Sequence, residues 1–150
     1  MQLSKNFTLA ELVRSYEGER KGVDNTASPH IISNLLLLAQ DILQPIRDKH
    51  GPVTIKSGYR SPTLNRLVGG SVTSDHVEGL AADIECASLS NYALAKWCKD
   101  NLKFEQLILE FYTPGDPKSG WVHISYGKKQ QCLTAVKENG KTIYKVGLVA

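Results

Sequence analysis

The chain has 150 residues, a net charge of +3 and 41% hydrophobic residues, which is enough for a single domain with one core. No segment approaches the roughly 20 consecutive apolar residues of a membrane-spanning helix. The charge excess is small and lacks a dense basic run, so nothing indicates nucleic-acid binding. No repeat or linker interrupts the chain. We therefore expect a monomer with one domain over residues 1–150, without a membrane segment.

Two helices are predicted in the first third of the chain. Thr8 and the acidic residue three positions later have the spacing of a capping box, which predicts a short helix over residues 9–16. A polar loop is expected at residues 17–27. The main core helix should follow over residues 29–50, because a serine-proline pair precedes it and apolar residues recur at helical spacing. Pro45 should kink or break this helix.

The remainder is predicted to consist mainly of strands. A short helical turn is expected at residues 63–67 and a helix at 88–101. A turn signal at residues 138–140 predicts a hairpin, which could extend the sheet or form an added partner surface. Helices followed by strands are typical of an α+β fold with a mostly antiparallel sheet. The predicted strands cover residues 53–57, 81–86, 105–112, 121–126, 130–136 and 141–146.

Strand alternation gathers polar side chains on one side of this sheet. In each of three strands the apolar residues share the core face, so the intervening polar residue must point away from it. These outward residues are His123, Asp83 and Glu110, and Phe111 is expected on the core face. His76 lies in a loop rich in serine and glycine, just before the strand of Asp83. From that loop it can fold over the same side of the sheet.

Two imidazoles and one carboxylate are the ligand set of a catalytic zinc site, which leaves a fourth position for water. The metal lowers the pKa of that water, and a carboxylate that is not a ligand can accept the proton. His76, Asp83 and His123 are therefore the candidate ligands, and Glu110 is the candidate base. The three cysteines lack Cys-x-x-Cys spacing, which argues against a thiolate site. Spacing alone leaves open that all four are polar residues of a half-exposed sheet.

Residues 74–83 read Ser-Asp-His-Val-Glu-Gly-Leu-Ala-Ala-Asp. This segment resembles the S-x-H-x-x-G-x-A-x-D signature of the zinc D-Ala-D-Ala peptidase family, which acts on bacterial peptidoglycan. The resemblance runs from Phe7 to about Tyr126 and is strongest to the short, single-domain branch, which is often phage-encoded. Other segments match in the same order: residues 57–62, Asn65, 68–71 and 121–123.

The resemblance implies a Hedgehog/D,D-peptidase-like fold, with helices on one face of the sheet and a zinc cleft on the other. It implies zinc ligands at His76, Asp83 and His123, and hydrolysis of a peptide bond in the peptidoglycan stem peptide. A D,D-carboxypeptidase, an L-alanyl-D-glutamate endopeptidase and a D,D-endopeptidase all fit. Because residues 1–7 contain no apolar segment typical of a secretory signal peptide, we expect synthesis in the cytoplasm. Action on the cell wall would then follow release by a phage holin or carriage in a virion, and a cytoplasmic recycling enzyme is the alternative.

Four further residues take roles from the resemblance. Arg60 matches the family arginine that holds the substrate carbonyl or carboxylate, and a guanidinium can also stabilise an oxyanion. Ser74 is expected to donate a hydrogen bond within the loop that supports the metal. Tyr59 and Trp121 are expected to line the cleft, and plain packing accounts for both aromatics equally well.

One position departs from the family pattern. Many members carry the catalytic glutamate three residues before the second ligand histidine, and here that residue is Gly120. The base must then come from another residue. Glu110 is favoured over Asp116, because Asp116 lies in a sequence of proline, glycine and aspartate that is typical of a turn. The alternative is a non-catalytic zinc module that binds the cell wall or has a structural role in a phage. A metalloprotease for protein substrates ranks last, because no long peptide groove is evident.

Overall fold

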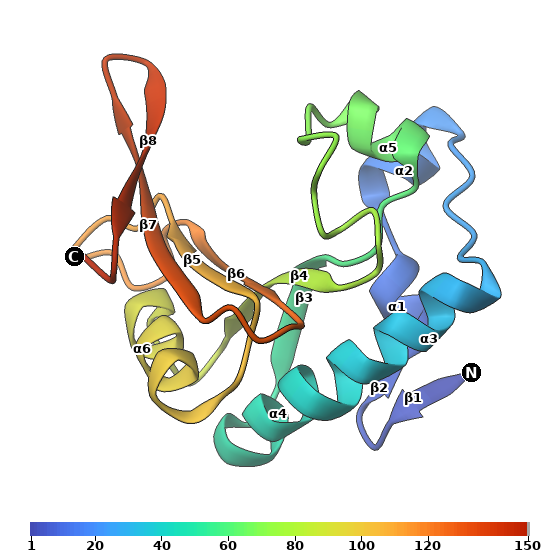
Figure 1. Ribbon diagram of the computed structural model, residues 1–150, viewed down its shortest axis with the longest axis horizontal. Coiled ribbons are helices and arrows are strands. Elements are labelled where there is room, and N and C mark those ends of the chain that lie inside the picture. The colour runs from blue at the N-terminus through green and yellow to red at the C-terminus, as the bar shows by residue number, and fades with distance from the viewer. Residues whose placement is uncertain (150) are drawn as a thin grey trace.

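A six-stranded sheet forms the centre of the computed structural model, which describes residues 1–149 (Figure 1). Its strands are β3 (Val53–Ser57), β4 (Ala81–Cys86), β5 (Gln106–Glu110), β6 (Trp121–Ser125), β7 (Gln131–Glu138) and β8 (Lys141–Val146). They lie in the order β3-β4-β6-β5-β7-β8, and every neighbouring pair is antiparallel except β5 and β7. The predicted α+β class with a mostly antiparallel sheet is confirmed.

Helices cover one face of this sheet and enclose the core (Figure 1). The apolar residues of β4, β5 and β6 point into that core, as alternation predicts, and examples are Ile84, Leu107 and Val122. The helices are α1 (Leu9–Val13), α2 (Tyr16–Lys21), α3 (Pro29–Leu38), α4 (Gln44–His50), α5 (Pro62–Leu67) and α6 (Asn91–Asn101), with the π-helix η1 (Ala39–Leu43) joining α3 to α4. Helices α3, α4 and α6 lie on the covered face, whereas α2 and α5 lie away from it (Figure 1). A small N-terminal pair, β1 (Gln2–Ser4) and β2 (Phe7–Thr8), was not predicted. No helix among residues 1–149 is long and apolar enough to cross a membrane.

Two expectations for the helices are wrong. The first helix ends at Val13 because Arg14 has extended backbone angles, and the supposed polar loop contains α2. The side chain of Ser15 caps α2 by accepting a hydrogen bond from the Gly18 N–H. The interruption expected at Pro45 is present near Gln44, although helical backbone continues from there to His50. The π-helix η1 ends at Leu43 and the Gln44 N–H bonds to the Ala39 carbonyl, five residues earlier, so the proline follows a widened turn.

The β7–β8 hairpin extends the sheet and projects from the molecule at the end opposite the N-terminus (Figure 1). Its turn contains Asn139 and Gly140, whose φ angles of 52° and 76° are both left-handed. Two consecutive left-handed residues are typical of the two-residue hairpin turn that matches strand twist. The open question of whether this hairpin joins the sheet is thereby answered.

Candidate metal centre

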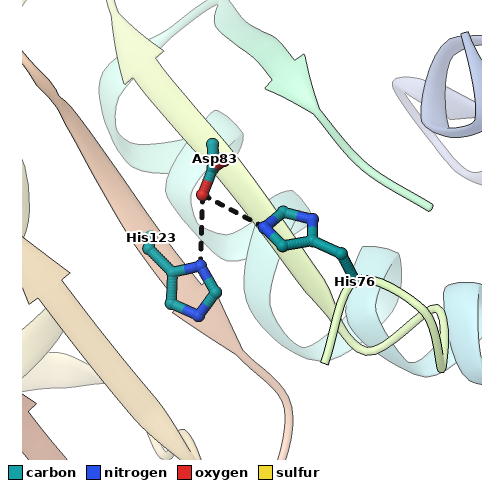
Figure 2. Close-up of side chains that lie close together, drawn as sticks. All are labelled: His76, Asp83 and His123. Atoms are coloured by element: carbon teal, nitrogen blue, oxygen red, sulfur yellow. Dashed lines mark hydrogen bonds and ion pairs between the residues drawn. The ribbon is translucent and has the colours of Figure 1, made fainter. Parts of the chain in front are cut away.

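Asp83 and His123 lie directly opposite each other on the paired strands β4 and β6. Both side chains point away from the helices, and His76 approaches them from the loop between α5 and β4 (Figure 2). One potential ligand atom from each residue lies within 4.8 Å of the others. The structure thus brings together the three residues that strand alternation and the loop position had indicated.

The loop of His76 is held in place from two sides. The His76 carbonyl accepts the N–H of Arg60 at 3.0 Å, and its Nδ1 lies 2.7 Å from the Gly58 carbonyl oxygen. Gly79 closes the turn with a φ of +72°, and a Cβ there would lie 2.9 Å from a methyl carbon of Ile31. A glycine is therefore required for His76 and Asp83 to reach one point.

The proton positions favour a cation between these groups. A carbonyl oxygen can only accept, so Nδ1 of His76 must donate to Gly58. In a neutral imidazole the other nitrogen, Nε2, is then an acceptor, yet it faces the Asp83 Oδ1 at 3.3 Å. Nδ1 of His123 lies 3.1 Å from the same oxygen. Two facing acceptors require a proton or a metal ion between them.

Two of the three separations between ligand atoms, and the burial, fit a tetrahedral zinc ion, and the third separation is within 4.8 Å. Zinc bonds of about 2.0–2.1 Å to nitrogen and oxygen place neighbouring ligand atoms about 3.3–3.4 Å apart. The observed separations of 3.3 Å and 3.1 Å are close to that value. His76 and His123 are 2% and 8% exposed. The carbonyl of Gly58 fixes the tautomer of His76, as an outer partner commonly does for a ligand histidine.

Charge at the centre is concentrated on Asp83. Burial acts to raise the pKa of its carboxyl, but the neighbouring imidazoles of His123 and His76 outweigh burial and hold that pKa below the ordinary value. Asp83 is therefore an ionised carboxylate, the form that binds a metal. Nε2 of His123 is buried and has no hydrogen-bond partner among residues 1–149.

Glu110 lies on the same side of the sheet, in register with Trp121 on the neighbouring strand. Its Oε2 accepts the indole N–H of Trp121 at 2.7 Å. Burial raises the pKa of the Glu110 carboxyl, and the negative charge of Asp83 raises it further, whereas His123 and the indole bond act in the opposite direction. A carboxyl with a raised pKa is suited to proton exchange near neutral pH.

Gly120 cannot be replaced by the family glutamate without moving the backbone. Its φ is +62°, and a Cβ at this position would lie 1.8 Å from the Glu110 carbonyl oxygen. The same atom would lie 2.7 Å from the carbonyl carbon of Phe111. The departure from the family pattern is therefore imposed by the packing of Gly120 against the end of β5.

Arg60 completes the lining of a cleft of about 1100 Å³ that also contains the three candidate ligands and Glu110. One guanidinium nitrogen donates to Ser74 Oγ at 3.3 Å, and the same oxygen accepts the His76 N–H at 3.2 Å. In both bonds Ser74 accepts rather than donates as expected, and it thereby links the arginine to the ligand loop. Nε of Arg60 is buried and lacks a partner within the described chain.

Two aromatic residues lie elsewhere than expected. Tyr59 is 7% exposed and belongs to the core. Its backbone hydrogen bonds to Leu12 and Asn25 hold it against α1. It lines a cavity other than the metal cleft. Phe111 was expected in the core but lines the cleft. Its φ of 55° reverses the alternation immediately after β5 ends.

Two functional contacts were missed from the sequence. Gly58 supplies the carbonyl that orients His76, and a Cβ there would lie 2.3 Å from the Leu12 carbonyl oxygen. Asn25 donates to the carbonyls of Val13 and Tyr59 at 2.7 Å and 3.0 Å and accepts the Ser61 N–H at 2.7 Å. It therefore holds the segment that carries Arg60. The only sequence signal for Asn25 was its position in a supposed polar loop.

Comparison with known proteins agrees with this geometry. A model of the family described as Peptidase M15 matches residues 5–125, which includes all three candidate ligands and Glu110. The chain belongs to the peptidase M15 family. The resemblance to zinc D-Ala-D-Ala peptidases is thereby confirmed. The family match ends at residue 125, before the β7–β8 hairpin begins.

One curated relative of this M15 chain is the "Zinc D-Ala-D-Ala carboxypeptidase" of Streptomyces albus G. It is 36% identical over 98 residues, a segment that covers 64% of this chain. The chain spans 37% of the length of that relative. The activity in the relative's name therefore belongs to a protein that is longer than the segment matched by this chain.

Proposed function

We propose that this chain is a zinc-dependent peptidase that hydrolyses a peptide bond in the peptidoglycan stem peptide. The convergence of His76, Asp83 and His123 on one point carries the proposal, because their facing acceptor atoms require a proton or a metal ion and two of their three separations fit zinc. The named activity of the Streptomyces albus G relative supports the substrate class. A D,D-carboxypeptidase and an L-alanyl-D-glutamate or D,D-endopeptidase are the reactions in question.

In this proposal each polar side chain of the cleft has a separate role in the hydrolysis. A bound zinc ion would acidify a water molecule and polarise the scissile carbonyl. Glu110 accepts the proton lost by the attacking water and returns it to the amine that leaves when the C–N bond breaks. Arg60 donates hydrogen bonds to the negative oxygen that develops on the carbonyl, or to a substrate carboxylate. Trp121 orients Glu110 through the indole bond.

A non-catalytic zinc module is the second candidate, and Gly120 is the observation in its favour. The position that carries the family glutamate has no side chain here. If Glu110 does not act as a base, the chain would bind zinc and the cell wall without hydrolysis. The two candidates differ in product formation and agree in metal binding.

The test is mass spectrometry of purified peptidoglycan incubated with the zinc-loaded chain, with and without a chelator. We expect a product that disappears with chelation, and its mass identifies the bond that is cut. Walls of several chemotypes should be used, because the stem peptide differs among them. Absence of product from all of them, with zinc bound in stoichiometric amount, would reject the peptidase and favour the non-catalytic module.

A further inference from the structure

The β7–β8 hairpin forms one wall of the metal cleft, and the proposed chemistry does not use it. Its contribution to the lining includes Leu133, Lys137, Thr142 and Tyr144. The family match ends at residue 125, so this wall lies outside the segment shared with the family. The hairpin therefore adds surface to the cleft without adding to the candidate metal centre.

Cross-strand register places the hairpin relative to the candidate base. Glu110 pairs with Ala135, and Ala135 pairs with Tyr144, so the three residues form one row on the cleft face of the sheet. At a strand spacing of about 4.8 Å, Tyr144 lies about 10 Å from Glu110 along this row. Ala135 contributes only a methyl group between them, and Tyr144 remains 55% exposed.

The same register gives the distance that a ligand must span between the metal centre and the hairpin. His123 pairs with Ile108 and Ile108 with Leu133, so β7 is two strands, or about 10 Å, from His123, and Lys137 lies four residues, or about 13 Å, farther along β7. The backbones of His123 and Lys137 are therefore about 16 Å apart, a distance that about four to five residues of an extended peptide span at about 3.3 Å per residue. A dipeptide at the metal centre is too short to reach Lys137. A longer stem peptide can contact both.

A cation is held at a defined position on this wall. The Lys137 ammonium lies 5.6 Å from the centroid of the Phe111 ring, a cation–π contact. The Phe111 ring packs against Trp121 with centroids 5.5 Å apart, and Trp121 holds Glu110. Within residues 1–149 no carboxylate forms a salt bridge with Lys137. An oriented cation without a counter-ion is suited to bind a carboxylate.

We propose that the hairpin is a specificity subsite for a free carboxylate about four to five residues from the scissile bond. Lys137 pairs with that carboxylate, and Tyr144 packs against the intervening peptide. The inference rests on the proposed peptidase function and deepens it. It makes the preferred substrate a long, carboxylate-bearing stem peptide rather than a dipeptide.

The experiment compares three substrates that contain the bond identified by mass spectrometry: a soluble muropeptide, the same muropeptide with its carboxylates converted to amides, and a dipeptide. The zinc-loaded full chain is compared with Lys137→Gln and Tyr144→Ala. For the muropeptide, Lys137→Gln should raise KM roughly two- to fivefold, the range for an exposed charge pair, with kcat unchanged. The amidated muropeptide and the dipeptide should show no such change. Tyr144→Ala should raise KM for both muropeptides and not for the dipeptide.

Lys141→Gln is the matched control. Lys141 is exposed on the same hairpin but pairs with Glu138 in register, one residue out of phase with the row that faces the cleft. Equal effects of the two lysine substitutions, or an equal effect of Lys137→Gln on all substrates, would overturn the subsite. If no substrate is hydrolysed, anisotropy of a fluorescent muropeptide bound to the zinc-loaded chain replaces KM. Weaker binding by Lys137→Gln alone would then support the subsite although the peptidase proposal had failed.

Discussion

Glu110 and Gly120 are adjacent in space, and the backbone of one limits the side chain of the other. The carbonyl oxygen of Glu110 occupies the position next to which a Cβ of residue 120 would have to lie. A side chain at residue 120 would displace the end of β5 and with it the carboxyl of Glu110. An acid at 110 with glycine at 120 is thus one self-consistent arrangement of the cleft, and it gives the proposed base a location that does not depend on residue 120.

Glu110→Gln should abolish hydrolysis while zinc still binds. The amide keeps the size of the side chain and can still accept the Trp121 indole bond, but it cannot take a proton from water. We expect kcat to fall by roughly 10²–10⁴, the range for loss of a general base. Zinc content by atomic absorption should remain unchanged. Glu85→Gln, on the same sheet but outside the cleft lining, is the control; near-normal turnover by Glu110→Gln would refute the assignment.

Gly120→Ala should destabilise the protein. An alanine at a φ of +62° costs about 1–2 kcal/mol, and overlap with the Glu110 carbonyl adds about 1–3 kcal/mol. We expect the free energy of unfolding to fall by about 2–5 kcal/mol in urea denaturation. Gly115→Ala is the matched control, because its φ is +88° but nothing lies within 4 Å of the added methyl group. Similar losses from both substitutions would show that the clash with Glu110 is relieved at little cost.

At the scale of single elements, local pattern predicted most strands and missed features that depend on contacts distant in sequence. The bounds of β3, β4 and β8 coincide with the predicted ranges, because alternation and flanking turn residues define them. The helix α2 was missed because its residues are polar and its cap is a single serine. The cleft position of Phe111 was missed because one left-handed residue ends the alternation, and a sequence pattern does not reveal φ.

Substitution of Asn25 tests whether the irregular segment that contains it helps to position the site. Its amide forms three part-buried hydrogen bonds that join α1 to the segment bearing Arg60. Asn25→Ala should lower the free energy of unfolding by roughly 2–3 kcal/mol, at about 1 kcal/mol per bond. It should also lower kcat/KM, because Arg60 loses its support. Asn101→Ala removes one exposed bond to Trp97 and should change neither quantity beyond about 0.5 kcal/mol in stability. Normal kcat/KM in Asn25→Ala would show that Arg60 is positioned by other contacts.

At the scale of the whole molecule, the two faces of the sheet have different roles. Helices and apolar side chains occupy one face, and the candidate ligands occupy the other. Alternation within each strand predicted this division. The order of the strands was not predictable in the same way, because the parallel pairing of β5 with β7 joins segments whose sequences contain no signal for each other. That pairing is what brings the hairpin to the cleft.

The separation of the faces predicts how the fold responds to metal. Since the core is complete without the metal centre, chelation should leave the chain folded and lower its thermal midpoint. Zinc at a free concentration 100 times its dissociation constant should stabilise the native state by about 2.7 kcal/mol. For a chain of this size that corresponds to a rise of roughly 5–10 °C, measurable by circular dichroism.

Substitution of a ligand distinguishes this effect from general binding of zinc to histidine. His123→Ala should remove most of the zinc-dependent rise, because the remaining pair holds a metal ion less well than three ligands. His30→Ala should retain the full rise, since His30 is exposed at the start of α3 and takes no part in the centre. If His123→Ala keeps the rise, zinc binds elsewhere in the chain. If chelation unfolds the wild-type chain, the metal supports the core as well, and the two faces of the sheet are not energetically separate.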